Sequence, residues 1–167
     1  MELPKRKDLR MKKYYFSENG HYFVTVCTAE RKETLSSIMV GEGLAPPEVK
    51  LTSLGKIAEE QIGALNERYG NVTAENYVIM PDHIHLLLFI DGFDAGGASP
   101  SPTLSDIICS FKSLTKKKSK EKGLCNKTIW QRSFYDHIIR DERDYAKHYD
   151  YTDNNPALWL LDKDEEI

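Results

Sequence analysis

Two histidines separated by one residue form the most chemically suggestive motif of the sequence, His83-Ile84-His85. The motif opens an apolar run, 83–90, whose length and composition predict a strand. Alternate side chains of a strand point to the same side, so both imidazoles should face one way. Two imidazoles one strand step apart can ligate one divalent ion and leave positions open for water, substrate or an oxygen ligand. The alternative is a pair of histidines at the rim of a sheet, satisfied by hydrogen bonds.

A tyrosine and an asparagine four residues apart form the second candidate group. Tyr151 and Asn155 lie just before Pro156 in a segment predicted as a helix, where residues i and i+4 share a face. That face would present a phenol, which can act as a nucleophile, beside an amide oxygen, which is a hard metal ligand. Asp144 and His148 fall on roughly the same face. The alternative is an ordinary tyrosine, one of nine in the chain, next to a helix end.

A third candidate is His137, which lies in a strand-like run, 133–140. Its position favours a structural or substrate-contacting role over a role as a metal ligand. We therefore treat His137 and His148 as supporting residues.

Positive charge is unevenly distributed along a chain whose formal net charge is −3. Segregated basic residues can create a surface that attracts phosphate even on an acidic protein. The basic residues that we expect to contact a polyanion are Lys5, Arg6, Lys7, Arg10, Lys112, Lys116, Lys117 and Lys118. The alternative is a solvated helix face and a frayed terminus.

Strand and helix patterns interleave along the chain and must position these side chains. Strand-like runs are predicted at 21–28, 77–80, 83–90, 128–130 and 133–140. Helices are predicted at 53–70, at 104–114 and from about 141 to 155, with loops at 41–47 and 91–102. The last helix should stop near Asn155, because Pro156 disfavours helix in the residue before it. The order fits a β-α-β-β-α-β pattern, which predicts an α+β fold with a ferredoxin-like antiparallel sheet and helices packed on it.

Length and composition predict one globular domain, since the chain has 167 residues and is 40% hydrophobic. We expect a flexible basic arm at 1–13, a single domain at 14–160 and an acidic tail at 161–167. No apolar run approaches the roughly 20 residues that a membrane span needs, and the N-terminus does not resemble a secretory signal. The three cysteines show no C-x-x-C spacing, which excludes a cysteine-built zinc site. The chain is predicted to be cytoplasmic, with no membrane partner.

Taken in order, these motifs resemble the REP-associated tyrosine transposases, a group within the HUH single-strand transposases. The resemblance extends from about Tyr14 to Trp159. It rests on the segments 22–28, 78–85, 111–113, 130–140 and 151–156.

The resemblance implies a role for each of four residues. His83 and His85 match the histidine pair of the HUH motif, Tyr151 matches the catalytic tyrosine, and Asn155 matches the residue that completes the metal site. It also implies Mg²⁺ or Mn²⁺ as cofactor and single-stranded or hairpin DNA as partner, in a nucleoid-associated protein. The DNA would be nicked and rejoined through a 5′-phosphotyrosine, at sites that are usually flanked by hairpins.

Two other classes of function stay open at this stage. One is a domesticated, non-enzymatic hairpin DNA-binding protein of the same fold, and the other is an unrelated metallohydrolase that uses His83 and His85. Tyr151 and Asn155 favour the transposase over the hydrolase, whereas nothing in the sequence separates the enzyme from the binding protein. A homodimer is likewise left open.

Overall fold

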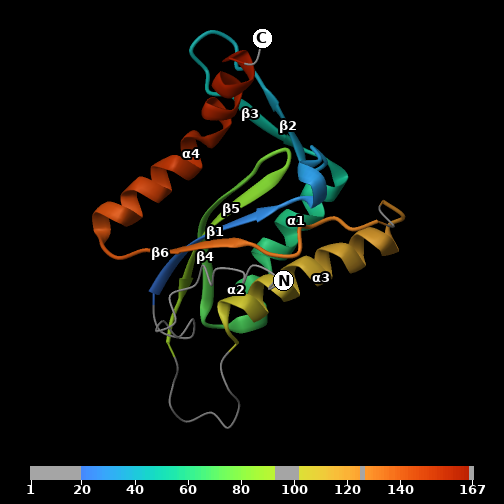
Figure 1. Ribbon diagram of the computed structural model, residues 1–167, viewed down its shortest axis with the longest axis vertical. Coiled ribbons are helices and arrows are strands. Elements are labelled where there is room, and N and C mark those ends of the chain that lie inside the picture. Colours follow the sequence, from blue (N-terminus) through green and yellow to red (C-terminus); the bar gives the residue numbers. More distant parts are fainter. Residues whose placement is uncertain (1–19, 93–101, 125–126, 166–167) are drawn as a thin grey trace, which may run out of the picture.

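A four-stranded antiparallel sheet organises the computed structural model, which describes residues 20–92, 102–124 and 127–165 (Figure 1). Its strands are β1 (Gly20–Cys27), β4 (Val72–Ile79), β5 (His83–Ile90) and β6 (Tyr135–Ile138). Their order across the sheet is β4-β5-β1-β6, and each neighbouring pair is antiparallel. Helices connect β1 to β4 and β5 to β6, so the connectivity is β-α-β-β-α-β. The predicted α+β fold is confirmed.

One face of the sheet is covered by α1 (Ser53–Gly63), α2 (Leu65–Tyr69) and α3 (Leu104–Glu121). The β1 and β5 side chains that point to this face are apolar and buried: Tyr22, Val24, Val26, Ile84, Leu86, Leu88 and Ile90. They pack with helix residues such as Ile62 and Phe111 in one core cluster. Removal of this apolar surface from water is the main stabilising contribution to the fold, at roughly 1.5–3 kcal/mol for each large side chain.

Side-chain caps fix where the core helices begin. The Thr52 hydroxyl accepts a hydrogen bond from the backbone N–H of Gly55 at the start of α1. At the start of α3, Thr103 and Asp106 form a reciprocal capping box. Such caps satisfy backbone N–H groups that have no partner within the helix.

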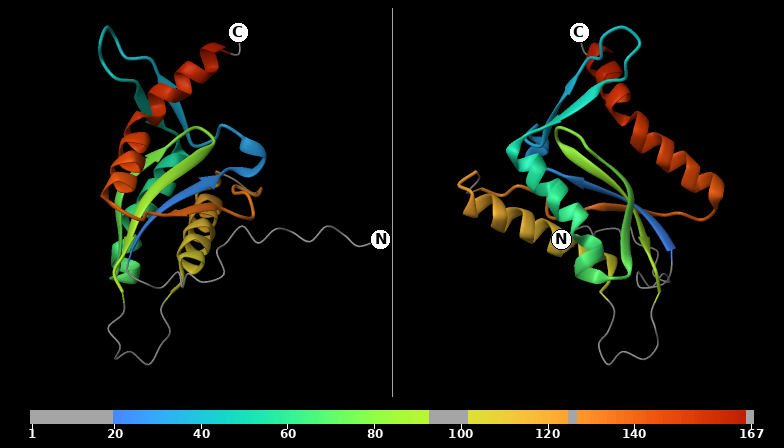
Figure 2. Two further views of the ribbon diagram at one scale, coloured as in Figure 1. Left: turned by 60° about the vertical axis from the view of Figure 1, so that its left-hand side comes forward. Right: turned by 180° about the vertical axis from the view of Figure 1, so that it is seen from behind.

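Within the described residues, one long helix, α4 (Glu142–Glu165), crosses the opposite face of the sheet (Figure 2). The prediction that this helix ends near Asn155 is wrong, because α4 continues through Pro156. A proline inside a helix removes one backbone hydrogen bond, but packing beyond it can offset the loss. Here the Trp159 ring packs 6.1 Å from that of His83, which holds the second half of α4 on the sheet. Residues 161–165 of the expected acidic tail form the end of α4.

A second, two-stranded sheet was not predicted from the sequence. Its strands are β2 (Ser36–Met39) and β3 (Glu48–Leu51), and the predicted loop at 41–47 connects them. A short 3₁₀ turn, η1 (Ala29–Arg31), links β1 to this hairpin. The run at 128–130 contributes only an isolated bridge between Thr28 and Trp130.

Several predictions concern residues outside the described ranges. The basic arm at 1–13 lies outside them, as does most of the loop at 91–102. Among the described helices, none combines the length and the apolar character needed to cross a membrane.

Candidate metal-dependent DNA-cleavage site

His83 and His85 lie on β5 with their side chains on the face that α4 covers. Their ring centroids are 4.6 Å apart, and the two residues are only 7% and 6% exposed. Ile84 between them points into the apolar core. The same alternation that builds the core therefore places both imidazoles in a separate cavity of about 390 Å³.

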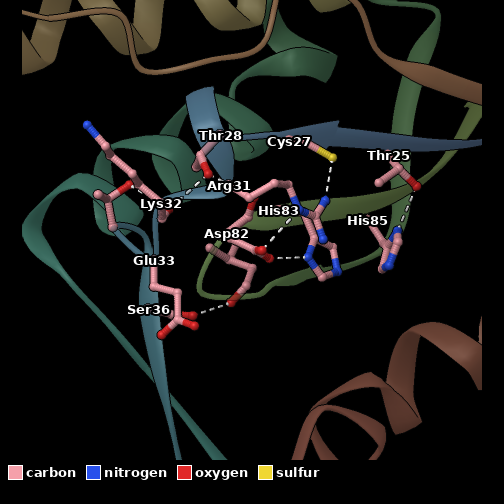
Figure 3. A network of polar contacts seen from close by, with 12 residues as sticks. Thr25, Cys27, Thr28, Arg31, Lys32, Glu33, Ser36, Asp82, His83 and His85 are labelled. Carbon is pink, nitrogen blue, oxygen red and sulfur yellow. Dashed lines mark hydrogen bonds and ion pairs between the residues drawn. The ribbon is translucent and has the colours of Figure 1, made fainter. Parts of the chain in front are cut away.

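Each imidazole is held through its Nδ1 atom by a neighbouring side chain (Figure 3). The Asp82 carboxylate lies 2.6 Å from Nδ1 of His83, and the Thr25 hydroxyl lies 2.8 Å from Nδ1 of His85. Such partners fix the orientation of a ring and the nitrogen that carries its proton. They leave the Nε2 atoms of both rings for other ligands.

Burial keeps both histidines in their neutral form. It lowers the pKa of His83, although hydrogen bonds to Asp82 and Asn155 oppose the shift. It lowers the pKa of His85 further, to about 3, with added repulsion from His83 and Arg31. Neutral imidazole is the form that binds metal ions.

Asn155 and Tyr151 reach the same cavity from α4. Asn155 is buried and forms a side-chain hydrogen bond with His83. Tyr151 is 43% exposed, and its ring centroid is 5.3 Å from that of His85. The structure thus brings together four residues from two elements that are distant in sequence.

The Nε2 atom of His85 is the most informative atom of the cavity. It is buried and has no hydrogen-bond partner in the described part of the chain. Most buried polar side-chain atoms do have a partner, and a role in binding an ion is one explanation for an exception. With the His83 imidazole and the Asn155 amide beside it, the donor set fits a divalent cation.

Arg31 and Asp82 also belong to this site, although neither was predicted as a site residue from the sequence. Asp82 is nearly buried and forms an ion pair with Arg31, with 3.0 Å between Oδ2 and Nε. Arg31 lines the cavity, and both it and Glu30 adopt left-handed backbone angles, with φ of 54° and 56°. An arginine in this position offers a planar donor suited to phosphate. Asp82 precedes the histidine motif and could have been noticed, whereas no local pattern indicates Arg31.

A hollow of about 670 Å³ adjoins the cavity and shares Tyr151 and Leu158 with it. Phe23 and His148 contribute rings to it, Leu158 contributes an apolar wall, and Lys147 adds a positive charge. The nucleophile candidate therefore lies between a polar cavity and an aromatic hollow.

The two supporting histidines lie outside the polar cavity. His137 on β6 and His148 on α4 both contact the Asp144 carboxylate, at 2.9 and 3.1 Å. Neither of them lines the cavity of His83 and His85.

The predicted DNA-contacting lysines of α3 fall into two groups. Lys116, Lys117 and Lys118 are exposed. Lys112 instead donates hydrogen bonds to the backbone carbonyls of Gln131 and Ser133, at 2.9 and 3.0 Å. Burial lowers the pKa of Lys112, and its engagement favours a structural tie to the segment before β6. Lys5, Arg6, Lys7 and Arg10 lie outside the described residues.

Comparison with known proteins finds relatives of this chain, although no family model matches it. It is 29% identical to an uncharacterised protein of Haemophilus influenzae over 95% of its length and 92% of that protein. It is 36% identical to a second protein of that organism, provisionally named a REP-associated tyrosine transposase, over 47% of this chain and 46% of the relative. It is also 25% identical to a REP-associated tyrosine transposase of Escherichia coli, over 86% of this chain and 70% of the relative.

A solved structure shows the same fold. It is that of a REP-associated tyrosine transposase bound to a REP hairpin, with a TM-score of 0.60 and 23% identity, covering 89% of this chain and 72% of that one. The chain therefore has the α+β fold of a transposase. By sequence it is a homologue of the REP-associated tyrosine transposases, which confirms the resemblance seen in its motifs.

Proposed function

We propose that this protein is a metal-dependent enzyme that nicks and rejoins single-stranded DNA beside hairpins, with Tyr151 as nucleophile. The observation that carries the proposal is the convergence of Tyr151, Asn155 and the unpartnered Nε2 of His85 on one cavity. The homology to REP-associated tyrosine transposases supports the same reaction class.

His83, His85 and Asn155 would hold the ion, which we propose to be Mg²⁺ or Mn²⁺. When bound, such an ion polarises the scissile phosphate and neutralises charge on its oxygens. Asp82 and Thr25 keep the two imidazoles oriented toward the cavity. Arg31 supplies a further positive charge at the same cavity, where it can bind a phosphate oxygen.

Tyr151 would carry out the covalent step. Its phenolic oxygen forms a bond to phosphorus as the bond between phosphorus and the 3′ oxygen breaks. The phenol loses its proton and the departing 3′ oxygen gains one, which leaves a 5′-phosphotyrosine and a free 3′-hydroxyl. Attack by a 3′-hydroxyl on this phosphotyrosine reverses the step and rejoins DNA without ATP.

The proposed substrate is a hairpin with single-stranded flanks, because the related transposase structure contains a REP hairpin. The hollow beside Tyr151 presents the rings of Phe23 and His148, on which an unpaired base can stack. The exposed lysines 116–118 on α3 offer charge for phosphates at a distance from the cavity. Basic residues 5–10 would add to this contribution.

A covalent-trapping experiment tests the proposal. The protein is incubated with end-labelled hairpin DNA and Mn²⁺, and the products are separated on a denaturing gel. We expect a protein–DNA band with the wild type and none with Tyr151→Phe, which loses only the phenolic oxygen and keeps DNA binding.

Tyr149→Phe is the matched control, because Tyr149 lies on the same helix but lines neither the cavity nor the hollow that Tyr151 lines. Its ring instead lies 6.0 Å from that of Tyr145. This variant should form the adduct as the wild type does. A wild type that binds the hairpin but never forms an adduct would instead identify a non-enzymatic hairpin-binding protein.

A further inference from the structure

A second cluster of side chains that could hold a metal ion lies on β6 and the first part of α4. The two elements follow each other along the chain (Figure 1). The cluster consists of His137, Asp144 and His148, and one ligand atom from each lies within 4.8 Å of the others. The Nε2 atom of His137 is 2.9 Å from Oδ2 of Asp144, and Nδ1 of His148 is 3.1 Å from Oδ1. The two imidazole rings are stacked, with 4.6 Å between their centroids.

We propose that His137, Asp144 and His148 form a second metal site, which binds a divalent transition-metal ion of the Zn²⁺ type. Two imidazoles and one carboxylate are the donor set of open, four-coordinate zinc sites, with water in the fourth position. Ligands on a tetrahedral Zn²⁺ ion are about 3.3 Å apart, given bonds of about 2.0–2.1 Å. The two nitrogen–oxygen contacts, which involve the two different oxygens of the Asp144 carboxylate, need to open by only a few tenths of an ångström to reach this spacing.

The cluster differs from the cavity of His83 and His85 in its oxygen donor, which is a charged carboxylate instead of a neutral amide. Two imidazoles with a carboxylate suit Zn²⁺, Cu²⁺ or Ni²⁺ more than Mg²⁺. The side chains are partly exposed, with 44% for His137, 20% for Asp144 and 17% for His148, so an ion can enter from solvent.

The central carboxylate is held in place by the turn before α4. Oδ2 of Asp144 also accepts the backbone N–H of Arg140, and the Asp141 carboxylate accepts the backbone N–H of Asp144. Asp144 and His148 are four residues apart on one helix face, and His137 joins them from the sheet. The three donors therefore come from two elements whose junction is already fixed.

An ion at this site would fasten the start of α4 to β6. The ring centroid of His148 lies 4.7 Å from that of Phe23, and the Phe23 centroid lies 5.0 Å from that of His85 and 6.1 Å from that of Tyr151. Fixing His148 would therefore restrain the helix that carries Tyr151, and would restrain the Phe23 ring that packs beside His85 and Tyr151. This inference does not depend on the function proposed above.

The alternative is a hydrogen-bonded cluster in which the Asp144 carboxylate accepts from His137, and the backbone carbonyl of Asp144 accepts from Nδ1 of His148 at 2.9 Å. His137→Gln separates the two, since a glutamine amide can still donate to the carboxylate but has no imidazole nitrogen for the metal. Asp144→Asn provides a second variant of unchanged size.

The test uses the full chain without a polyhistidine tag, in a His83→Ala/His85→Ala background that removes the other candidate site. Chelator-treated protein is titrated with Co²⁺, with visible absorption and equilibrium dialysis as readouts, and Zn²⁺ is then added as competitor. We expect one Co²⁺ per chain at micromolar concentration, with the intense bands of tetrahedral geometry and displacement by Zn²⁺.

Adding His137→Gln or Asp144→Asn should weaken Co²⁺ binding by more than roughly 10- to 100-fold. That range is typical for the loss of a residue that only hydrogen-bonds to a metal ligand. His21→Gln, which changes the one histidine outside both groups, should leave binding unchanged. Circular dichroism of metal-free protein checks that each variant is folded. The proposal is overturned if the background protein binds no Co²⁺, or if His137→Gln binds it as tightly as its parent.

Discussion

His85 and Leu86 are neighbours on β5, yet they serve opposite faces of the sheet. Leu86 is fully buried among aliphatic and aromatic side chains beneath α1 and α3. His85 is almost as deeply buried, at 6% exposure, but it lies beneath α4 beside other polar and aromatic groups. The core face therefore stabilises the fold by burying apolar side chains. The face beneath α4 instead buries side chains that could bind a metal or react.

The difference shows how one strand can combine a core and a site. The period of two residues sends every second side chain to each face, so the same run supplies both without a loop. All five histidines of the chain belong to strands of this sheet or to α4, and none joins the apolar core cluster. Helix α4 covers the polar face and contributes Tyr151 and Asn155 to it.

The sharpest test of this comparison changes the two neighbours separately. His85→Ala should reduce adduct formation by more than about 100-fold, because it removes a proposed metal ligand rather than an outer partner. Its free energy of unfolding should fall by less than that of an apolar core truncation, because only Nδ1 of His85 has a hydrogen-bond partner, Thr25, and Nε2 has none in the described structure. Single-turnover adduct formation and urea unfolding measure the two effects.

Leu86→Ala is the matched change on the other face. It should lower the free energy of unfolding by about 2–5 kcal/mol through lost burial and a residual cavity. In the protein that stays folded, adduct formation should persist. Equal losses of stability in the two variants would show that the faces do not divide the tasks in this way.

The pH dependence of stability offers a second test, carried out on metal-free protein. The pKa of His85 is about 3, against an ordinary value of 6.5, so between these values the unfolded chain binds a proton that the folded protein does not. Stability therefore rises with pH in this window. The contribution of His85 should be complete above about pH 6.5 and fall by at most about 5 kcal/mol as the pH approaches 3.

Urea unfolding at several pH values between these limits measures the slope. His85→Gln should flatten it, because glutamine does not titrate. An unchanged slope in this variant would assign the acid sensitivity to other groups.

Asp82→Asn should have a smaller effect, which acts through His83. The carboxylate lies 2.6 Å from Nδ1 of His83 and also pairs with Arg31. Replacing such an outer partner typically lowers metal affinity by about 10- to 100-fold. Mn²⁺ titration of the adduct reaction should show a raised metal requirement with little loss at saturating metal, whereas an unchanged requirement would remove Asp82 from the site.

The smallest effect is expected on α3, far from the cavity. Lys117→Gln should flatten the plot of log affinity for hairpin DNA against log salt by about one unit, the value for one phosphate contact. Lys112→Gln is the control, because its ammonium donates to the carbonyls of Gln131 and Ser133. It should lower stability and leave the slope unchanged, and a flattened slope with Lys112→Gln alone would reverse the two assignments.

Periodicity was sufficient to predict most of the sheet and the helices on its core face. The pattern from 83 to 90 defines β5, and the apolar stripe after Thr103 defines the start of α3. Prediction from local sequence failed where tertiary contacts determine the ends of an element. Pro156 predicted a helix end, but packing of Trp159 on His83 carries α4 further. The strands of the β2–β3 hairpin have only four residues each, so even the alternation in Glu48–Leu51 was too short to indicate a strand.

The site was predictable to the extent that its residues occur in motifs. His83 and His85 share a strand face, and Tyr151 and Asn155 share a helix face, so the spacing indicates each pair. That the two pairs meet depends on how α4 lies across the sheet. Arg31 reaches the cavity from a turn with left-handed backbone angles, which no local sequence pattern predicts. The pairing of His137 with Asp144 likewise depends on the junction of β6 and α4.

The most direct measurement of the central claim is the identity of the residue that becomes attached to DNA. The adduct formed with hairpin DNA and Mn²⁺ is digested with nuclease and trypsin, and tandem mass spectrometry locates the modified residue. We expect a 5′-phosphorylated nucleotide on Tyr151, within the peptide that also contains Tyr149. Attachment at Tyr149 or at any other residue would contradict the assignment of the cavity as the site of DNA cleavage.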